Sequence, residues 1–413
     1  MERMLERCAG LDVHKKTVTA CVRVPGAHGD RTQHVRTFDT TTAALLVLRD
    51  WLAAHAITHV AMESTGARES IGGPSTMSSK TRSPVSSPTP RRSPKCPGRK
   101  TDVKDGVWIA QLLEPGLMRA SFVPPAPIRE LRDLTRSRKV LIQERTRPAH
   151  RLHKVLEDAG ITLISVARRR LGVSGRAMLD ALVAGTTDPE VLADLARGRL
   201  RKKRPALRQA LVGRFRSHHA FLVSQLLAPV DDLDEAIQTS GGHLDEVLVP
   251  FTDELARLDT IRGINQRTAE VVIAEIGVDM TVFPTAKHLA SWAGLCPGNN
   301  QSAGQHRSGK TRPANRWLRA ALSEAAWAAS TRAAPGAFAA RYRRILPHRG
   351  HKEAIVAVAR AMLVTIYHQL TRQTTSHDPG TDDDDRRHAE RLRRRALQTL
   401  ERQGYRVTLE PAA

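Results

Sequence analysis

The sequence lacks the features that mark secreted proteins, zinc fingers and membrane proteins. Its four cysteines lie far apart and form no C-x-x-C pair, which argues against a zinc site or a disulfide framework and fits a reducing cytoplasm. The first seven residues mix acids and bases and no apolar segment follows, so we expect no signal peptide. The most apolar late stretch, residues 354–370, contains Arg360 and His368 and is too short to span a bilayer. We therefore interpret it as a core helix and expect a cytoplasmic protein with no membrane partner.

Aromatic residues are scarce, and the acids are too few to balance the bases. Phe, Trp and Tyr make up 4% of the 413 residues, so base stacking is not expected to dominate nucleic-acid binding. Against 42 acids stand 65 lysines and arginines, which gives a formal net charge of +23. A protein this basic usually meets a polyanion, because each phosphate that it neutralises releases condensed counterions. Nucleic acid, contacted mainly through its phosphates, is the expected partner.

Strand and helix signals alternate through the first sixty residues. β-rich runs occupy residues 8–13, 17–24, 32–38 and 58–63. Apolar residues at helical spacing occupy residues 41–55, with Thr41 or Thr42 as a cap. The order β-β-β-α-β is that of a ribonuclease-H-like domain, with an antiparallel meander first and a crossover helix afterwards. We assign this α/β domain to residues 1–125.

The segment 70–96 interrupts that pattern. It contains eight serines, five prolines, no acid and no aromatic residue, a composition typical of a disordered insert. A frameshift is the alternative. Back-translated with G/C-rich codons and read in a shifted frame, its beginning gives an aromatic and apolar pattern that suits a packed domain. The nucleotide sequence of the gene would decide between the two explanations.

Beyond residue 97 the sequence predicts mostly helices. We expect one at residues 104–113 and one at 128–147, the second interrupted by Pro148, because a helix-interior proline loses a hydrogen bond and clashes with the preceding turn. A coiled-coil seam follows, which Pro229 breaks. Its apolar residues are spaced seven, four or three positions apart in the sequence. They are Phe215, Leu222, Leu226, Val230, Leu233 and Ile237. Residues 126–240 thus form a helical, coiled-coil region, and Gly241–Gly242 is the expected linker.

A third, mainly helical domain is expected at residues 245–375. It begins with a helix, a tight turn and a helix over residues 258–276, and it continues with helices at 286–293 and 315–332. The remaining residues, 376–413, form a charged tail with an acidic run at 382–385 followed by a basic helix. We expect this tail to be solvated.

Four carboxylates are candidates for metal binding. Asp12 ends one predicted strand, and Glu63 ends another that should lie next to it. Asp102 and Asp105 are spaced i, i+3 and so share one face of a helix. Carboxylates that converge at one end of a sheet repel each other strongly without cations. Two Mg²⁺ ions about 3.5–4 Å apart would relieve this repulsion and activate attack at a phosphodiester. The alternative is that each acid is an ordinary solvated surface group.

The loop at residues 295–312 is the second candidate site. Ser302 and Ser308 lie in a glycine-punctuated, strongly basic segment. A serine that attacks phosphorus needs cations to stabilise the developing charge, and three are near in sequence: Arg307, Lys310 and Arg312. Composition alone favours the simpler alternative, a loop that grips phosphate with no covalent step.

Two further segments are candidates for phosphate contact. Residues 261–276, with Gly263 in the turn, have the form of a helix-hairpin-helix, which points backbone N–H groups at a phosphate without reading sequence. Basic runs lie at residues 168–170 and 197–204, and the second ends in Arg201, Lys202, Lys203 and Arg204. Such runs are usually solvated faces, but the overall excess of positive charge favours phosphate contact here.

Four motifs together carry a family resemblance. They are GLDVHKK at residues 10–16, AMESTG at 61–66, GRKTDVKD at 98–105, and LASWAGLCPG at 289–298 with its Ser/Gly-rich sequel. In this order and spacing the chain resembles the insertion-sequence one-ten (IS110) family of transposases, the bridge-RNA-guided recombinases of bacteria. The likeness covers nearly the whole chain except residues 68–96.

The resemblance implies a site and partners. The N-terminal domain would be a RuvC-type nuclease fold whose D-E-D-D set, matched by Asp12, Glu63, Asp102 and Asp105, binds Mg²⁺. In the C-terminal domain a serine would join covalently to DNA, and Ser302 matches that position better than Ser308. The family implies a homo-oligomer, a dimer or a tetramer joined through coiled coils, with carboxylates and serine from different subunits in one site. It also implies double-stranded DNA and a guide RNA as partners.

The chain departs from the family in places. Arg262 and Asn265 replace a proline and a glycine of the hairpin turn, and we expect Asn265 to tolerate the left-handed region with some strain. With Pro148 and the segment 70–96, this predicts a decayed, poorly active copy. Two alternative functions are a Holliday-junction-type endonuclease without a covalent intermediate and a non-catalytic DNA-binding protein.

Overall fold

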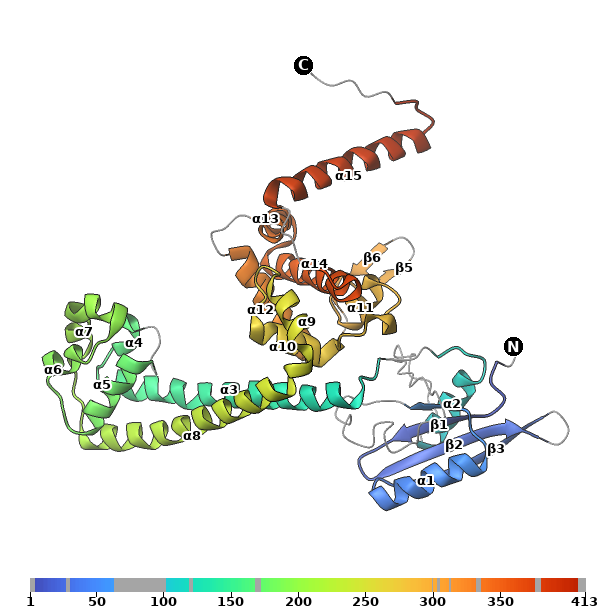
Figure 1. The fold of residues 1–413 in the computed structure, drawn as a ribbon, viewed down its shortest axis with the longest axis horizontal. Coiled ribbons are helices and arrows are strands. Elements are labelled where there is room, and N and C mark those ends of the chain that lie inside the picture. The colour runs from blue at the N-terminus through green and yellow to red at the C-terminus, as the bar shows by residue number, and fades with distance from the viewer. Residues whose placement is uncertain are drawn as a thin grey trace. The chain divides into compact units, whose positions relative to one another are not determined.

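The computed structural model describes residues 4–26, 30–62, 102–118, 122–167, 172–298, 300–302, 305–311, 313–331, 336–375 and 380–407. For Asp102 and for residues 300–302, 305–308, 331, 380–385, 387, 388, 391, 392 and 395, the backbone alone is described. The chain divides into two compact units, Met1–Ala126 and Pro127–Ala413 (Figure 1). The segment 70–96, and with it the frameshift hypothesis, lies outside the described residues.

Unit 1 is built on a four-stranded sheet with the strand order β3-β2-β1-β4. β1 (Cys8–Val13) pairs antiparallel with β2 (Thr17–Pro25), and β2 pairs antiparallel with β3 (Arg31–Asp39). After the crossover helix α1 (Thr42–Ala54), β4 (His59–Met62) pairs parallel with β1. The expected order β-β-β-α-β is confirmed, and the bounds of these elements differ from the expected ones by at most one residue.

Helices cover both faces of this sheet. α1 packs on one face, where its Leu48 and Leu52 join a buried cluster with Ala9 and Leu11 of β1. α2 (Asp102–Leu113) packs on the other face. Side chains alternate along a strand, so β1 turns Asp12 towards the face that α2 covers.

Two long helices dominate the first half of unit 2, α3 (Ala126–Asp158) and α8 (Ser217–Val247). Midway along them, Arg145 of α3 donates a hydrogen bond from Nη2 to Oδ2 of Asp234 of α8, at 2.7 Å. Five short helices lie between them in the chain and form a small domain with its own apolar core. They are α4 (Leu163–Val166), α5 (Val173–Val183), α6 (Pro189–Asp194), η1 (Gly198–Lys203) and α7 (Arg204–Ala210).

Three expected breaks in these helices are wrong. α3 continues through Pro148, and α8 continues through Pro229 and through the expected linker Gly241–Gly242. An interior proline costs about 3 kcal/mol, and a glycine about 1 kcal/mol, relative to alanine. Packing on both sides of each break outweighs these costs: α3 buries side chains near both of its ends, and so does α8. Tertiary burial therefore overrides the local preference.

The expected coiled-coil seam is only partly buried within the chain. Its Val230 is buried and its Phe215 and Leu226 pack against the core of the small domain, whereas its Leu222 is 43% exposed. Val223 and Leu227, which the expected seam leaves out, lie in that core, and α5 packs against α8 there. Contact with that core sets which stripe of α8 is buried within the chain, and the pairing of α8 with a second copy stays a prediction.

The rest of unit 2 is mainly helical, as expected, with a single two-stranded hairpin among the described residues. Its elements are η2 (Val249–Phe251), α9 (Thr252–Asp259), α10 (Gln266–Ile276), η3 (Met280–Val282), α11 (Ala286–Trp292), β5 (Asn300–Ser302), β6 (Gln305–Ser308), α12 (Arg316–Thr331), α13 (Ala337–Arg349), α14 (His351–Arg372) and α15 (Gly380–Arg402).

α14 contains the apolar stretch that we interpret as a core helix. It is the one helix in the described part of the chain that is long and apolar enough to cross a membrane. Half of its most apolar window is buried inside the protein, however, including Val358, Met362 and Ile366. Core helices of soluble proteins pass the same test, so the finding is weak evidence for a membrane span.

Candidate active-site residues

Asp12 lies at the carboxyl end of β1, next to β4 in the sheet. The parallel register between these strands runs from Cys8–His59 to Leu11–Met62. Asp12 is the next residue of β1, and its side chain is 9% exposed. Glu63 follows Met62 in the sequence but lies outside the described residues. The structure therefore shows one acid at this edge of the sheet, on the face that α2 covers.

A close contact between backbones brings α2 onto this edge. A Cβ added to Gly10 would lie 2.3 Å from the carbonyl oxygen of Gly106 and 2.5 Å from the nitrogen of Ala110. A Cβ on Gly106 would lie 3.2 Å from the carbonyl oxygen of Thr19, the residue that pairs with Asp12 across β1 and β2. Position 10 therefore needs glycine for this approach, and a side chain at position 106 would make a tight contact.

The same contact sets the position of the first turn of α2, which carries Asp102 and Asp105. Asp105 directly precedes Gly106 and is half-buried in the first turn of the helix, and Asp102 is the first residue of α2. The first turn of α2 thus lies against the end of β1 that carries Asp12. Carboxylate oxygens in such a setting are ligands of the kind that Mg²⁺ prefers, so the donor set fits this ion.

His14 is a neighbour of Asp12 that the sequence motif contains but to which we assigned no role. Its Nε2 lies 3.1 Å from Oδ2 of Asp12, and its side chain is 49% exposed.

Two thiols lie near the face of the sheet that α2 covers. Burial, and secondly the charge of Glu114, raise the pKa of the Cys8 thiol to about 11. Burial also raises the pKa of Cys21 to about 11, so both thiols are neutral at physiological pH.

Glu114, just beyond the other end of α2, is a buried acid of a different kind. Its Oε2 accepts a hydrogen bond from Nε of Arg23 at 2.8 Å, and its Oε1 lies 2.8 Å from Nε of Arg31 in an ion pair. Two guanidinium groups therefore neutralise it and tie the end of the helix to β2 and β3. We assign Glu114 to the fold rather than to a reaction.

The segment with the candidate serines forms a hairpin in unit 2. β5 pairs antiparallel with β6, with Ser302 opposite Gln305 beside the turn and Ser308 opposite Asn300 at the base. The N–H of Gly298 donates to the carbonyl oxygen of Lys310 at 3.2 Å and closes the base. The side chain of Arg307 and all of Arg312 lie outside what the structure describes, whereas Lys310 is exposed.

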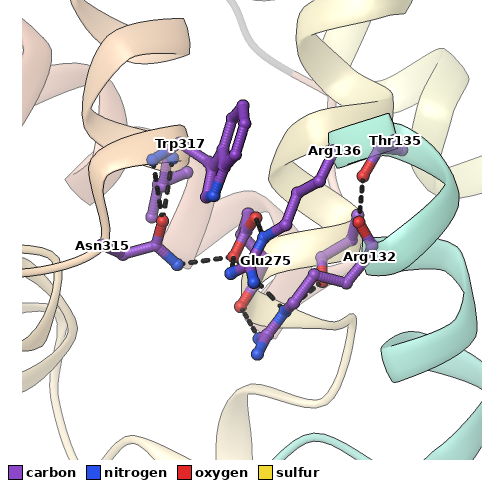
Figure 2. A network of polar contacts seen from close by, with 8 residues as sticks. Arg132, Thr135, Arg136, Glu275, Asn315 and Trp317 are labelled. Atoms are coloured by element: carbon purple, nitrogen blue, oxygen red, sulfur yellow. Dashed lines mark hydrogen bonds and ion pairs between the residues drawn. The ribbon is translucent and has the colours of Figure 1, made fainter. Parts of the chain in front are cut away.

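A buried carboxylate that the sequence analysis missed anchors the far end of this loop (Figure 2). Asn315 caps α12, since its Oδ1 accepts from the N–H groups of Trp317 and Leu318 at 3.1 Å each. Its Nδ2 donates to Oε2 of Glu275 at 2.5 Å. Glu275 is fully buried in α10, and Arg136 of α3 donates to both of its oxygens, at 2.8 and 3.0 Å.

Arg132 of α3 completes this network. It donates from Nη2 to the backbone oxygen of Glu275 at 2.7 Å, and its Nε lies 3.3 Å from the Glu275 carboxylate. A second buried acid of α10, Glu270, accepts from Arg138 of α3 at 2.8 Å. The sequence contained a signal for this network. Glu270 and Glu275 lie among the apolar residues of α10, and buried glutamates need cationic partners.

The turn between α9 and α10 corrects one expectation. Gly263, with φ +90°, is the left-handed residue, and its Cβ would lie 2.5 Å from the carbonyl oxygen of Ala325. Asn265 is extended (φ −116°, ψ 170°), and its Oδ1 accepts from the N–H of Thr268 at 2.9 Å. Asn265 is therefore an ordinary N-cap of α10 and not a strained residue, because capping satisfies a free N–H group.

The basic run at residues 201–204 spans the end of η1 and the start of α7. Arg201, Lys202 and Lys203 are exposed, and Arg204 lies 3.4 Å from Asp194. Its exposure fits phosphate contact and a solvated face equally well. The run at 168–170 lies outside the described residues.

Geometry gathers one group of possible metal ligands in the described part of the chain, Asp158, His218 and His219. Nδ1 of His219 accepts from the backbone N–H of Arg216 at 3.1 Å. In the neutral ring Nε2 then carries the proton and donates to Oδ2 of Asp158, also at 3.1 Å. With both ring nitrogens engaged, His219 serves as a cap for α8, and its neutral ring has no free nitrogen to offer an ion.

Comparison with known proteins identifies relatives. A family model described as "Transposase", of the DEDD type, matches residues 9–161, and the model of the "Transposase IS116/IS110/IS902 family" matches residues 255–343; together they cover more than half of the chain. The chain is 33% identical over 114 residues to "Insertion element IS110 uncharacterized 43.6 kDa protein" of Streptomyces coelicolor. It is 27% identical over 254 residues to "Putative transposase y4rJ" of Sinorhizobium fredii.

These matches are partial. The first covers 27% of this chain and 28% of its relative, and the second covers 59% of this chain and 58% of its relative. The chain is thus aligned with about a quarter and somewhat more than half of the lengths of these two proteins.

Proposed function

The chain belongs to the IS116/IS110/IS902 family of transposases, and from that premise we propose that it cleaves and rejoins DNA strands with Mg²⁺ and a serine nucleophile. The metal ligands in this proposal are Asp12, Glu63, Asp102 and Asp105, in a ribonuclease-H-like (RuvC-type) domain. The nucleophile is Ser302. The α9–α10 turn with Gly263, the cations beside the serine and the run at 201–204 contact nucleic-acid phosphates.

The close contact of Gly10 with Gly106 is the observation that supports this proposal most. It leaves no room for a side chain between the end of β1 and the first turn of α2, so Asp12 and Asp105 lie on elements in backbone contact. Two acids on elements in backbone contact, one of them buried, would repel each other less with a cation bound between them. Bound Mg²⁺ would polarise a phosphodiester and neutralise the charge that develops on it. His14 would orient the Asp12 carboxylate through its contact at Nε2.

The serine step is a transesterification at phosphorus. Oγ of Ser302 forms a bond to phosphorus and loses its proton, while the bond from phosphorus to a deoxyribose oxygen breaks and that oxygen gains a proton. Attack by another strand's hydroxyl on the serine ester reverses the step and rejoins DNA. Ser302 is favoured over Ser308 because it lies beside the turn of the hairpin, whereas Ser308 lies at the base. Arg307, Lys310 and Arg312 would stabilise the charge on the phosphoryl oxygens.

The proposed partners follow from the family. They are double-stranded DNA, a guide RNA from the element's flank, and further copies of this chain, as a dimer or a tetramer. The acids of unit 1 and the serine of unit 2 would then come from different subunits. We also expect low activity, because residues 70–96 lack the composition of a packed domain.

Because low activity is expected, the test needs two readouts. The purified chain is incubated with its flanking RNA, DNA that carries the element's ends, and Mg²⁺; covalent protein–DNA adducts and the rise in Tm on adding Mg²⁺ are measured. Asp12→Asn should abolish the Mg²⁺-dependent rise. Ser302→Ala should lower adduct formation more than about a hundredfold, whereas the matched variant Ser308→Ala should retain it. An unchanged Mg²⁺ response in Asp12→Asn would overturn the metal site.

The same variants separate the alternatives. A Holliday-junction-type endonuclease would still cleave junctions as Ser302→Ala, because its carboxylates act alone. A non-catalytic DNA-binding protein would keep every measurable property as Asp12→Ala. The nucleotide sequence around codons 66–100 tests the frameshift, and a shifted frame that is equally rich in serine and proline would rule it out.

A further inference from the structure

A cavity of about 920 Å³ in unit 2 has several basic side chains in its wall. It lies among the α9–α10 turn, the start of α11, α13 and α14. Five basic side chains line it: Arg262, Lys287, Arg341, Arg360 and His368. None of the described residues that line it is acidic. We call it the basic cavity.

A second cavity in the same unit, of about 890 Å³, provides the contrast. It lies among α3, α8, α10 and α12, and we call it the paired cavity. Three of its cations pair with acids that line the same walls: Arg136 with Glu275, Lys139 with Glu324, and Arg267 with Asp245. Cations gather in both cavities, but among the described lining residues only the paired cavity also contains acids.

Arg360 is the residue on which the inference depends. It is the single lysine, arginine, aspartate or glutamate between Glu353 and Arg372 of α14. It has no ion-pair partner in the described part of the chain, and it is half-buried. Burying part of a charge without a partner is unfavourable, and nearby like charges add to the cost. An anionic ligand would remove both costs.

The face of α14 that carries Arg360 explains why this apolar helix is only half buried. Ala357, Ala361, Val364 and His368 follow at helical spacing and line the cavity with Arg360. The residues on the opposite face are packed in the core. The small side chains leave space for a ligand, and the Arg360 guanidinium lies beside an apolar surface.

The remaining wall is apolar and partly aromatic. Phe338 and Ile345 of α13 line it, and so does Tyr367 of α14, whose hydroxyl donates to the backbone oxygen of Phe283 at 3.0 Å and fixes the ring. The chain has only ten phenylalanines and tyrosines, so two of them beside four lysines and arginines is a notable concentration. Phosphates and flat apolar groups are the two chemical parts of a nucleotide.

We propose that the basic cavity binds one unpaired nucleotide of a nucleic-acid strand. Arg360, with Arg341 and Arg262, holds the phosphates, and the base lies against Phe338 and Tyr367. Pockets for small molecules measure roughly 300–1,000 Å³, so the volume suits a nucleotide. A paired base is less suitable, because leaving the duplex costs a few kcal/mol. Arg262 belongs to the α9–α10 turn, so the strand would continue onto the proposed phosphate-binding turn. The inference rests on the proposed function for its choice of nucleic acid.

The test measures binding of the full chain to fluorescein-labelled oligonucleotides by anisotropy. The probes are single-stranded oligothymidine, oligouridine of the same length and a DNA duplex. Arg360→Gln removes the cation, and Ala361→Phe fills the cavity without changing its charge. Matched controls are Arg343→Gln, an exposed arginine of α13 outside the lining, and Ala320→Phe, the same enlargement in the paired cavity. Circular dichroism checks that each variant is folded.

Both cavity variants should weaken binding of a single strand about tenfold, the effect of losing about 1.4 kcal/mol. Both controls, and the duplex with any variant, should stay within about threefold, because one exposed phosphate contact contributes little at moderate salt. If the cavity variants weaken binding of oligothymidine more than binding of oligouridine, the nucleotide comes from DNA. If they weaken binding of oligouridine more, it comes from RNA.

Three results would overturn the proposal. Unchanged binding in Arg360→Gln removes the cavity from nucleic-acid binding. A loss in Arg360→Gln without one in Ala361→Phe reduces it to a surface phosphate contact. Equal losses in Arg343→Gln mean that only total charge matters. If one of these occurs while Asp12→Asn still loses its Mg²⁺ response, the inference fails and the proposed function stands.

Discussion

The paired cavity and the basic cavity are similar in size and rich in arginine, yet their arginines are used differently. In the paired cavity, Arg136 donates twice to Glu275, Lys139 lies 3.2 Å from Glu324, and Arg267 lies 3.4 Å from Asp245. In the basic cavity, no acid stands opposite Arg360 among the described lining residues. In the first arrangement the protein itself supplies acids to these three cations. In the second, Arg360 has no acid beside it among the described lining residues.

This difference between the two cavities helps to interpret the lysines and arginines of a strongly basic chain. Net charge indicates a polyanionic partner but does not say which residues meet it. An arginine held by a buried carboxylate contributes to the fold, and removing its partner leaves a buried charge. An arginine in a cavity without acids costs free energy in the absence of a ligand and so marks a binding site. Three substitution experiments test this distinction.

Replacement of Glu275 in the wall of the paired cavity should have the largest effect. Glu275→Gln leaves Arg132 and Arg136 without the carboxylate, and the Arg132 side chain is only 4% exposed. We expect the free energy of unfolding to fall by about 3–5 kcal/mol. Urea unfolding followed by tryptophan fluorescence measures it. Glu324→Gln is the control, because its 68% exposed carboxylate should contribute less than about 1 kcal/mol. Equal effects of the two variants would contradict the distinction.

Replacing one arginine of each cavity with methionine should change the free energy of unfolding less than Glu275→Gln does. The two replacements should also differ from each other. Arg138→Met removes a partner of the fully buried Glu270, which keeps Arg267 at 2.8 Å, so a loss of about 2–3 kcal/mol is expected. Arg360→Met removes one of several like charges and should leave the free energy of unfolding within about 0.5 kcal/mol or raise it. Calorimetric Tm values of the ligand-free chain test both. A large destabilisation by Arg360→Met would show that Arg360 is a structural residue.

An exposed ion pair should give the smallest effect and a reference for the buried ones. Nη2 of Arg176 donates to Oδ2 of Asp231 at 2.8 Å, and this hydrogen bond lowers the pKa of Asp231 below its ordinary value of 3.8. A lowered pKa gives stability that is complete above the ordinary value and is lost as the pH falls through the lowered one. Arg176→Gln should therefore cost less than about 1 kcal/mol at neutral pH. Its difference from the wild type in Tm should shrink as the pH drops below about 4, and a constant difference would exclude the pair as the cause.

The sheet of unit 1 could be predicted because its signals are local. β-rich runs with short turns gave the strands, and Thr41 caps α1 by accepting from the N–H of Ala44 at 3.3 Å, as its position before the apolar residues suggested. The place of Asp12 at a strand end followed from the same pattern. The gathering of the four acids stays a prediction, because Glu63 and the side chain of Asp102 lie outside the described residues.

The features that the sequence did not reveal depend on contacts between distant residues. Pro148 and Pro229 signal a helix break in any local interpretation, and only burial on both sides of them keeps α3 and α8 continuous. Arg360 was noticed within an apolar stretch, but nothing in the sequence shows that α13 and the α9–α10 turn form a cavity around it. The partners of Glu275 are equally distant, so its role could not be predicted.

The carboxylate of Glu275 has a consequence for how unit 2 opens. Its contacts join α10 to Arg132, 143 residues earlier, and to Asn315, 40 residues later. Releasing α3 alone would leave this carboxylate buried without its arginines, and fraying the start of α12 would leave it without its amide. Separate opening of either helix is thus unfavourable, and amide hydrogens of α3, α10 and the first turn of α12 should exchange with solvent in one cooperative step. The long helix α3 and the helix that follows the serine loop, α12, would therefore lose their structure together.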